Sequence, residues 1–125
     1  MTTELGKESG AQAGPSYQSL AELVAAMQGL TDDPLHATGS KMVIYRGNPA
    51  AKLMIVGEAP GPQEDKQGKP FVGPSGKLLD QILESVNLTS EQDVFITNAV
   101  FRLPPGVDDR AVRKPTTAEI NFYKP

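Results

Sequence analysis

One short run of apolar residues limits the fold of this chain more than any other feature. Residues 53–56 (Leu-Met-Ile-Val) are continuous and apolar, which is typical of a strand buried on both faces of a parallel sheet. The run passes directly into residues 57–61 (Gly-Glu-Ala-Pro-Gly), so the expected strand ends in a loop rich in glycine and proline. A buried parallel strand needs helices on both faces of its sheet, and the sequence therefore predicts an α/β fold.

The segments that follow complete a β–α–β unit. Apolar residues between 78 and 86 recur at helical spacing, with Ser75 as the expected N-cap, and residues 94–96 (Val-Phe-Ile) begin a second expected strand that ends in Asn98. A strand, a helix and a strand at this spacing predict two parallel strands joined by a right-handed crossover. Residues 42–45 are also strand-like, yet even three strands make only part of a sheet that is covered on both faces.

Two further helices are expected. Apolar residues between 20 and 27 fall on one helical face, with Ser19 as the N-cap and Gly29 as the stop. Thr116 and Glu119 have the spacing of a capping box that opens a last helix.

Length and composition exclude several classes of protein. A chain of 125 residues has room for one domain, and residues 1–15, which are polar and lack periodicity, are expected to be a disordered leader to a domain in residues 16–125. The chain has no cysteine, so it can form neither a disulfide nor a cysteine-bound metal site. No apolar run approaches the roughly 18 residues of a membrane span, so we expect a cytoplasmic monomer without a membrane partner. The net charge of −3 excludes a uniformly basic surface but leaves room for a local basic patch.

Polar residues follow both expected strands at the edge where parallel α/β sheets bind ligands. Glu58 follows the first strand and Asn98 ends the second, so a carboxylate and a carboxamide should share one crevice. The carboxamide offers both a donor and an acceptor, which suits the edge of a nucleobase. Phe71 stands in a loop rich in glycine and proline, away from any periodic apolar face, where its ring could stack on a base.

Each of these features also has a purely structural interpretation. Residues 57–61 can be a tight turn, Asn98 can cap a turn or helix, and Phe71 can plug its loop onto the core. Glu58 and Glu64 can be solvated loop charges. The residues alone leave both interpretations open.

Other motifs fail on spacing. Residues 73–77 (Gly-Pro-Ser-Gly-Lys) are similar to part of a phosphate-binding loop, but Phe71 and Leu78 stand where that motif needs glycine and Ser or Thr. The single histidine, His36, has no second ligand near it in the sequence, so we expect no metal site. Residues 110–114 hold a small basic cluster, which could touch a DNA backbone or be a solvated loop.

An ordered series of motifs makes the chain resemble the type-4 uracil-DNA glycosylases. Residues 57–79 read G-E-A-P-G-x-x-E-D and then G-x-P-F-V-G-x-S-G-x-L-L. Residues 96–98 (Ile-Thr-Asn) and 104–106 (Pro-Pro-Gly) continue the pattern, and residues 114–120 (K-P-T-x-x-E-I) follow in order. The resemblance extends from about residue 29 to residue 125.

The resemblance implies an α/β/α sandwich on a four-stranded parallel sheet, and a reaction in which water hydrolyses the N-glycosidic bond of a uracil flipped out of DNA. Phe71 would then stack on uracil and Asn98 would hydrogen-bond its polar edge. Glu58 would position water or stabilise the positive charge that develops on the sugar, and Glu64 is a second candidate for this catalytic role. The implied substrate-binding residues that would line the pocket with backbone groups are Gly57, Ala59 and Gly61.

The chain departs from the family's pattern in two respects. The resemblance implies four cysteines that bind a [4Fe–4S] cluster, but other residues stand at those positions: Leu30, Asp33, Arg102 and Tyr123. None is a good iron ligand, so we expect a variant that binds no cluster and has no cofactor. Family members are also longer, which implies that the chain is truncated at its C-terminus and holds only the N-terminal half to two thirds of the domain, without a histidine-containing loop of the family.

We therefore expect a uracil-DNA glycosylase-like enzyme of base-excision repair, with uracil-containing DNA as its partner. One alternative is a non-catalytic member that binds uracil, a nucleotide or DNA. Another is an inactive truncated fragment. Only the enzyme requires a catalytic carboxylate such as Glu58.

Overall fold

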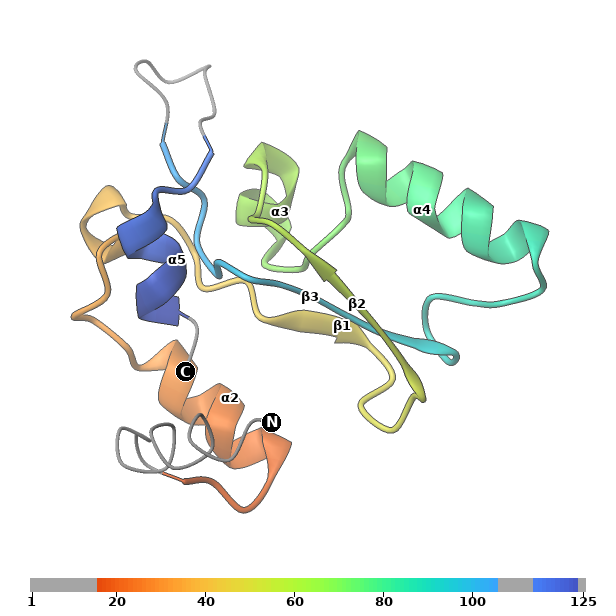
Figure 1. Cartoon of the computed structure of the whole chain (residues 1–125), viewed down its shortest axis with the longest axis horizontal. Coiled ribbons are helices and arrows are strands. Elements are labelled where there is room, and N and C mark those ends of the chain that lie inside the picture. Colours follow the sequence, from red (N-terminus) through yellow and green to blue (C-terminus); the bar gives the residue numbers. More distant parts are fainter. Residues whose placement is uncertain (1–15, 106–113, 124–125) are drawn as a thin grey trace, which may run out of the picture.

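The computed structural model describes residues 16–105 and 114–123, and the expected leader at residues 1–15 lies outside the described part. A small sheet forms the centre of the molecule, with α4 on one side of it and α2 and α5 near each other at the opposite end (Figure 1). None of the helices in this part of the chain has the length and apolarity needed to cross a membrane. In chain order the elements are α2 (Leu20–Gln28), the 3-10 helix η1 (His36–Thr38), β1 (Tyr45–Gly47), β2 (Leu53–Gly57), α3 (Pro62–Gln67), α4 (Pro74–Ser85), β3 (Val94–Asn98) and α5 (Thr117–Tyr123).

The sheet has the strand order β1-β3-β2 and mixed strand directions. β2 and β3 pair in parallel, with Gly57 opposite Asn98, which confirms the predicted β–α–β unit. The strand expected over residues 42–45 begins later, at Tyr45, and pairs antiparallel with β3, so the sheet is not purely parallel. The connection explains the direction. Only residues 48–52 join β1 to β2, whereas a parallel arrangement of the two would need a crossover of about a dozen residues or more.

Helix α4 covers one face of this sheet. Leu83 of α4 packs against Val94 and Ile96 of β3, and all three side chains are buried. On the opposite face, Met54 and Val56 of β2 are 59% and 57% exposed. Within the described residues β2 is therefore covered on one face, whereas its continuous apolar run predicted burial on both.

A second core lies where α5 meets the early part of the chain. Leu35, Val100 and Tyr123 form a buried cluster, with Phe101 and Ile120 packed against it. The rings of Phe101 and Tyr123 meet edge to face with their centroids 5.8 Å apart. This core attaches α5 to the segments that precede β1 and follow β3.

The predicted caps of the first and last helices are confirmed. The Ser19 hydroxyl accepts a hydrogen bond from the Glu22 N–H at 3.2 Å, and Gly29 is the C-cap of α2. Thr116 and Glu119 form the reciprocal pair of a capping box at the start of α5, at 2.8 and 3.2 Å.

The start of α4 differs from the prediction, and α3 was not predicted. Gly73, not Ser75, is the N-cap of α4, and Pro74 is its first residue. Proline suits that position because an N–H there would have no partner within the helix. Helix α3 is polar along its whole length and therefore gives no apolar periodicity to detect. Its start is fixed instead by Glu64, whose carboxylate accepts a hydrogen bond from the Gly61 N–H at 2.9 Å.

Candidate functional site

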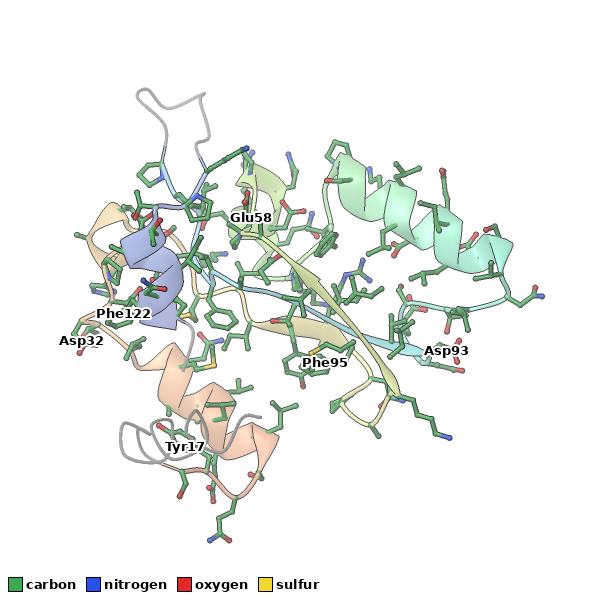
Figure 2. All side chains as sticks on the ribbon, in the orientation of Figure 1. Tyr17, Asp32, Glu58, Asp93, Phe95 and Phe122 are labelled. Carbon is green, nitrogen blue, oxygen red and sulfur yellow. The ribbon has the colours of Figure 1, made fainter. Side chains whose placement is uncertain are left out.

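The carboxyl ends of β2 and β3 open into a pocket of about 410 Å³. Gly57 and Asn98 are register partners at the last positions of these strands, and Glu58 stands just beyond the end of β2, near α3 (Figure 2). Ligands of α/β sheets bind at this edge. The residues that line the pocket are Glu58, Ala59, Pro60, Gly61, Glu64, Phe71, Ser75, Asn98 and Lys114.

Gly57 lies at the base of this site and allows two side chains to come close to the backbone. A Cβ atom at Gly57 would stand 2.5 Å from Asn98 Oδ1 and 2.5 Å from Phe71 Cζ. Contacts this short do not occur, so any larger residue would displace the amide or the ring. The absence of a side chain at Gly57 thus leaves room for both the Asn98 amide and the Phe71 ring beside the backbone.

Phe71 is held in an unusual backbone conformation. Its φ of 57° lies in the left-handed region, which aromatic residues seldom adopt. Gly76 leaves room for this turn, because a Cβ atom there would stand 1.8 Å from the Phe71 carbonyl oxygen. Arg46 fixes the same segment by donating to the carbonyl oxygens of Pro70 and Phe71 at 2.7 and 2.8 Å, and it pairs with Asp80 at 3.0 Å.

Glu64 uses its carboxylate to hold the loop around Phe71. Oε1 accepts from the Gly61 N–H at 2.9 Å, and Oε2 accepts from the N–H groups of Val72 and Gly73 at 2.8 and 2.7 Å. Partial burial by itself raises the pKa of this carboxyl, but the N–H groups of Gly73, Val72 and Gly61 outweigh it and hold the pKa of Glu64 below its ordinary value. Both oxygens are therefore occupied by the backbone.

The side chains of Asn98 and Glu58, unlike that of Glu64, form no hydrogen bonds with the described residues. The Asn98 side chain is buried, with 4% of the residue exposed, yet its amide forms no hydrogen bond with any described residue. The exposed Glu58 carboxylate also has no hydrogen-bond partner among the described residues. Asp33 Oδ1 is the only fully buried and unpaired side-chain atom in the described residues, so the Asn98 amide keeps contact with the open pocket, where a ligand can pair with it. The pocket can hold a small planar molecule that stacks on Phe71 and has a polar edge.

The structure brings together the predicted site residues. Gly57 lies beneath the pocket, and the other predicted residues line it: Glu58, Ala59, Gly61, Glu64, Phe71 and Asn98. Sequence reasoning missed Pro60, Ser75 and Lys114 as pocket residues. A signal for all three existed, because they stand in the motifs that carry the family resemblance. The neighbouring basic residues Arg110 and Arg113 lie outside the described residues.

A second group of predicted residues meets outside the lining of the pocket. Three of the four positions where the resemblance implies cluster ligands join their side chains: Asp33 Oδ2 accepts from Arg102 Nε at 2.6 Å and from the Tyr123 hydroxyl. Leu30, at the fourth position, accepts through its carbonyl oxygen from Arg102 Nη2 at 3.0 Å. We call the Asp33, Arg102 and Tyr123 side chains the clasp.

The clasp does not fit an iron–sulfur cluster. Such clusters need thiolate ligands, and the chain has no cysteine. The Leu30 side chain offers no donor atom, and the Arg102 guanidinium is a cation that donates its hydrogen bonds to oxygen atoms. Elsewhere in the described ranges, no group of three or more His, Cys, Asp or Glu side chains could hold a metal ion.

Comparison with known proteins points to one family. The sequence profile described as "Uracil DNA glycosylase superfamily" matches residues 44–124. The Type-4 uracil-DNA glycosylase of Archaeoglobus fulgidus is 41% identical over 103 residues, which are 82% of this chain and 49% of that protein. The protein of the same name in Thermotoga maritima is 39% identical over 89 residues, 70% of this chain and 46% of its own length. That of Saccharolobus solfataricus is 51% identical over 63 residues, 50% of this chain and 29% of its own length. The chain thus spans about half the length, or less, of these curated relatives.

Proposed function

Since this chain belongs to the uracil-DNA glycosylase superfamily, we propose that its pocket binds a uracil flipped out of DNA and that the chain hydrolyses the N-glycosidic bond of that nucleotide. One observation carries the proposal: the Asn98 amide, the Phe71 ring and the Glu58 carboxylate line the same pocket. Uracil-containing DNA is then the partner, and removal of the base is a step of base-excision repair.

The recognition of uracil rests on Asn98 and Phe71. The edge of uracil presents an N–H donor beside carbonyl acceptors, and a carboxamide can pair with both. The Asn98 amide has no hydrogen bond to a described residue that it would have to give up, so a bound base can pair with it directly, at about 0.5–1.5 kcal/mol for each bond. The Phe71 ring supplies a stacking surface, and the missing side chain of Gly57 leaves room for both this ring and the Asn98 amide. Thymine differs from uracil by a 5-methyl group, so steric exclusion is the expected basis of specificity.

We assign the catalytic role to Glu58. Hydrolysis of the N-glycosidic bond develops positive charge on the sugar, which a nearby carboxylate stabilises, and the same carboxylate can orient the attacking water. Glu58 has a carboxylate without hydrogen bonds to the described residues, whereas Glu64 accepts three backbone hydrogen bonds. Glu64 is therefore assigned to positioning the loop and Glu58 to the chemistry.

Base removal can be tested directly on the 125-residue chain. Single-stranded and double-stranded oligonucleotides that hold one uracil are incubated with the protein, and abasic sites are detected by alkaline strand cleavage. We expect abasic product from the wild-type chain and about a hundredfold less from Glu58→Gln. Glu84→Gln, which alters an exposed carboxylate on α4, is the matched control and should retain activity. Failure to bind or cleave either substrate would contradict the proposal.

Binding without turnover is a second candidate function. The observation that favours it is that the Glu58 carboxylate is exposed and forms no hydrogen bond with a described residue that would orient it for catalysis. Fluorescence anisotropy with uracil-containing and thymine-containing oligonucleotides separates the two functions. An enzyme loses cleavage in Glu58→Gln but keeps its preference for uracil-containing DNA. A binding module shows that preference in the wild-type chain without producing abasic sites.

A further inference from the structure

The clasp joins three segments that are remote in the sequence. Arg102, which follows β3, bonds to Asp33 in the segment between α2 and η1, and Tyr123 of α5 bonds to the same carboxylate oxygen. Arg102 Nη1 also donates to the carbonyl oxygen of Ser40 at 2.5 Å. The guanidinium thus donates through all three of its nitrogens, and each bond closes a long loop of the chain.

The clasp is withdrawn from solvent. The Asp33 side chain is fully buried and that of Arg102 is 7% exposed, so the ion pair has a low-dielectric environment. The only buried side-chain atom without a hydrogen-bond partner in the described residues is the other carboxylate oxygen, Asp33 Oδ1. Removing one partner of such a pair leaves an uncompensated buried charge, so the two charges depend on each other.

The positions of these residues carry the inference. Leu30, Asp33, Arg102 and Tyr123 are the positions where the family resemblance implies the four ligands of a [4Fe–4S] cluster, and all four meet in this structure. A cluster with four protein ligands cross-links the segments that supply them. The clasp cross-links the same segments with an ion pair and hydrogen bonds, and none of its groups can serve as a thiolate ligand.

We propose that the clasp is a metal-free replacement for the cluster, so that α5 is anchored to the 30–40 segment without iron or sulfide. The edge-to-face contact of Tyr123 with Phe101 adds an apolar contact to the same anchor. This inference does not depend on the proposed glycosylase activity, because it concerns how the fold is held together.

The first experiment tests the dependence on metal. The purified chain is incubated anaerobically with ferrous iron and sulfide, desalted and analysed for both elements, and its thermal unfolding is compared before and after treatment with a chelator. We expect no bound iron or sulfide and an unchanged melting temperature. Stoichiometric iron and sulfide whose removal lowers the melting temperature would overturn the proposal.

The second experiment tests the anchor itself by amide hydrogen exchange of the peptide that contains α5. Asp33→Asn should accelerate this exchange about tenfold or more relative to its matched control Asp32→Asn. Asp32 carries the same carboxylate one residue away but is exposed, and it lies at the outer edge of the molecule in Figure 2. Equal exchange in the two variants would show that the clasp does not anchor α5.

A milder variant covers the case in which Asp33→Asn does not fold. Tyr123→Phe removes only the hydroxyl that donates to Asp33 and keeps the ring in its aromatic contacts. Exchange of the α5 peptide should accelerate by about three- to tenfold in this variant. The control is Tyr17→Phe, which alters an exposed tyrosine ahead of α2 and should have no effect. If neither tyrosine variant changes the exchange of α5, the proposal is wrong.

Discussion

The pocket and the clasp both contain polar side chains of residues that are largely buried, but they use those side chains differently. In the clasp, Arg102 donates to Asp33, Ser40 and Leu30, so all three nitrogens of its guanidinium form hydrogen bonds within the protein. In the pocket, Asn98 is only 4% exposed as a residue, but its amide opens onto the cavity and has no partner among the described residues. The first arrangement stabilises a fold and the second is available to a ligand.

The difference shows which observations indicate function. Burial of a polar residue does not by itself distinguish a binding site from a structural network, because both regions have it. What separates them is whether the polar group opens onto a cavity without a protein partner, because the unpaired Asp33 Oδ1 of the clasp is buried and has no such opening. Glu64 illustrates the rule within the pocket, because its carboxylate lines the cavity but is paired with backbone N–H groups. A structural effect is therefore expected from changes at Glu64 and a functional one from changes at Asn98.

The largest effect is expected from Arg102→Met. This variant leaves the Asp33 carboxylate buried without its counter-charge, which should lower the free energy of unfolding by about 3–5 kcal/mol. Urea denaturation followed by circular dichroism measures the change. The double variant Asp33→Leu/Arg102→Met removes both charges and should be more stable than Arg102→Met alone. A double variant that is less stable than the single one would show that the two charges are not coupled.

Asn98→Ala should reduce activity strongly but change stability little. Because the amide has no hydrogen bond to lose, we expect the free energy of unfolding to change by less than about 1 kcal/mol. Uracil release should fall by about a hundredfold, because a donor and an acceptor for the base are gone. The two measurements are urea denaturation and the abasic-site assay. A loss of stability as large as that of Arg102→Met would remove the distinction between the two regions.

Much of the fold around the pocket was predictable because local sequence determines it. The parallel pair β2 and β3, the helix α4 between them and the convergence of Glu58 with Asn98 follow from an apolar run, a helical period and the topology of β–α–β units. The antiparallel direction of β1 was not predicted, although the connection at residues 48–52 is too short for a parallel crossover to β2. Helix α3 also escaped prediction, since it has no apolar face.

The clasp could not be predicted from residue types. Asp33, Arg102 and Tyr123 are up to 90 residues apart, and no local pattern links them. The resemblance indicated only that they replace cluster ligands. That they bond to one another depends on side-chain geometry that the structure supplies. The role of Glu64 was likewise hidden, because its partners are backbone N–H groups that any residue could provide.

Glu64→Gln is expected to have a smaller effect than Arg102→Met or Asn98→Ala. The amide cannot accept on both sides, so one end of the loop loses its contact, and exchange of the Val72 and Gly73 amides should accelerate about tenfold.

The hydrogen bonds of the Glu64 carboxylate should also respond to pH. The folded-state pKa of Glu64 is below its ordinary value of 4.5, so its contribution to stability is complete above that pH and is lost as the pH falls further through the folded-state value. Wild-type stability should therefore fall more steeply than that of Glu64→Gln below about pH 4.5. Parallel pH profiles of the two proteins would contradict this assignment.

The smallest effect is expected from Asp80→Asn. This variant changes the ion pair of Arg46, which holds the Phe71 segment, in the same way that Asp33→Asn changes the ion pair of the clasp. Asp80 pairs with Arg46 at 3.0 Å, but its side chain is 39% exposed, so water screens the interaction. Arg46 also keeps its two bonds to the carbonyl oxygens of Pro70 and Phe71, which hold the ring in place without Asp80. We expect a change of less than about 1 kcal/mol in the free energy of unfolding and almost unchanged uracil release. Urea denaturation of Asp80→Asn beside Asp33→Asn compares one chemical change in an exposed and a buried arginine–aspartate pair. If the two variants lose similar stability, burial does not explain the strength of the clasp, because the same loss would then occur in a solvated pair.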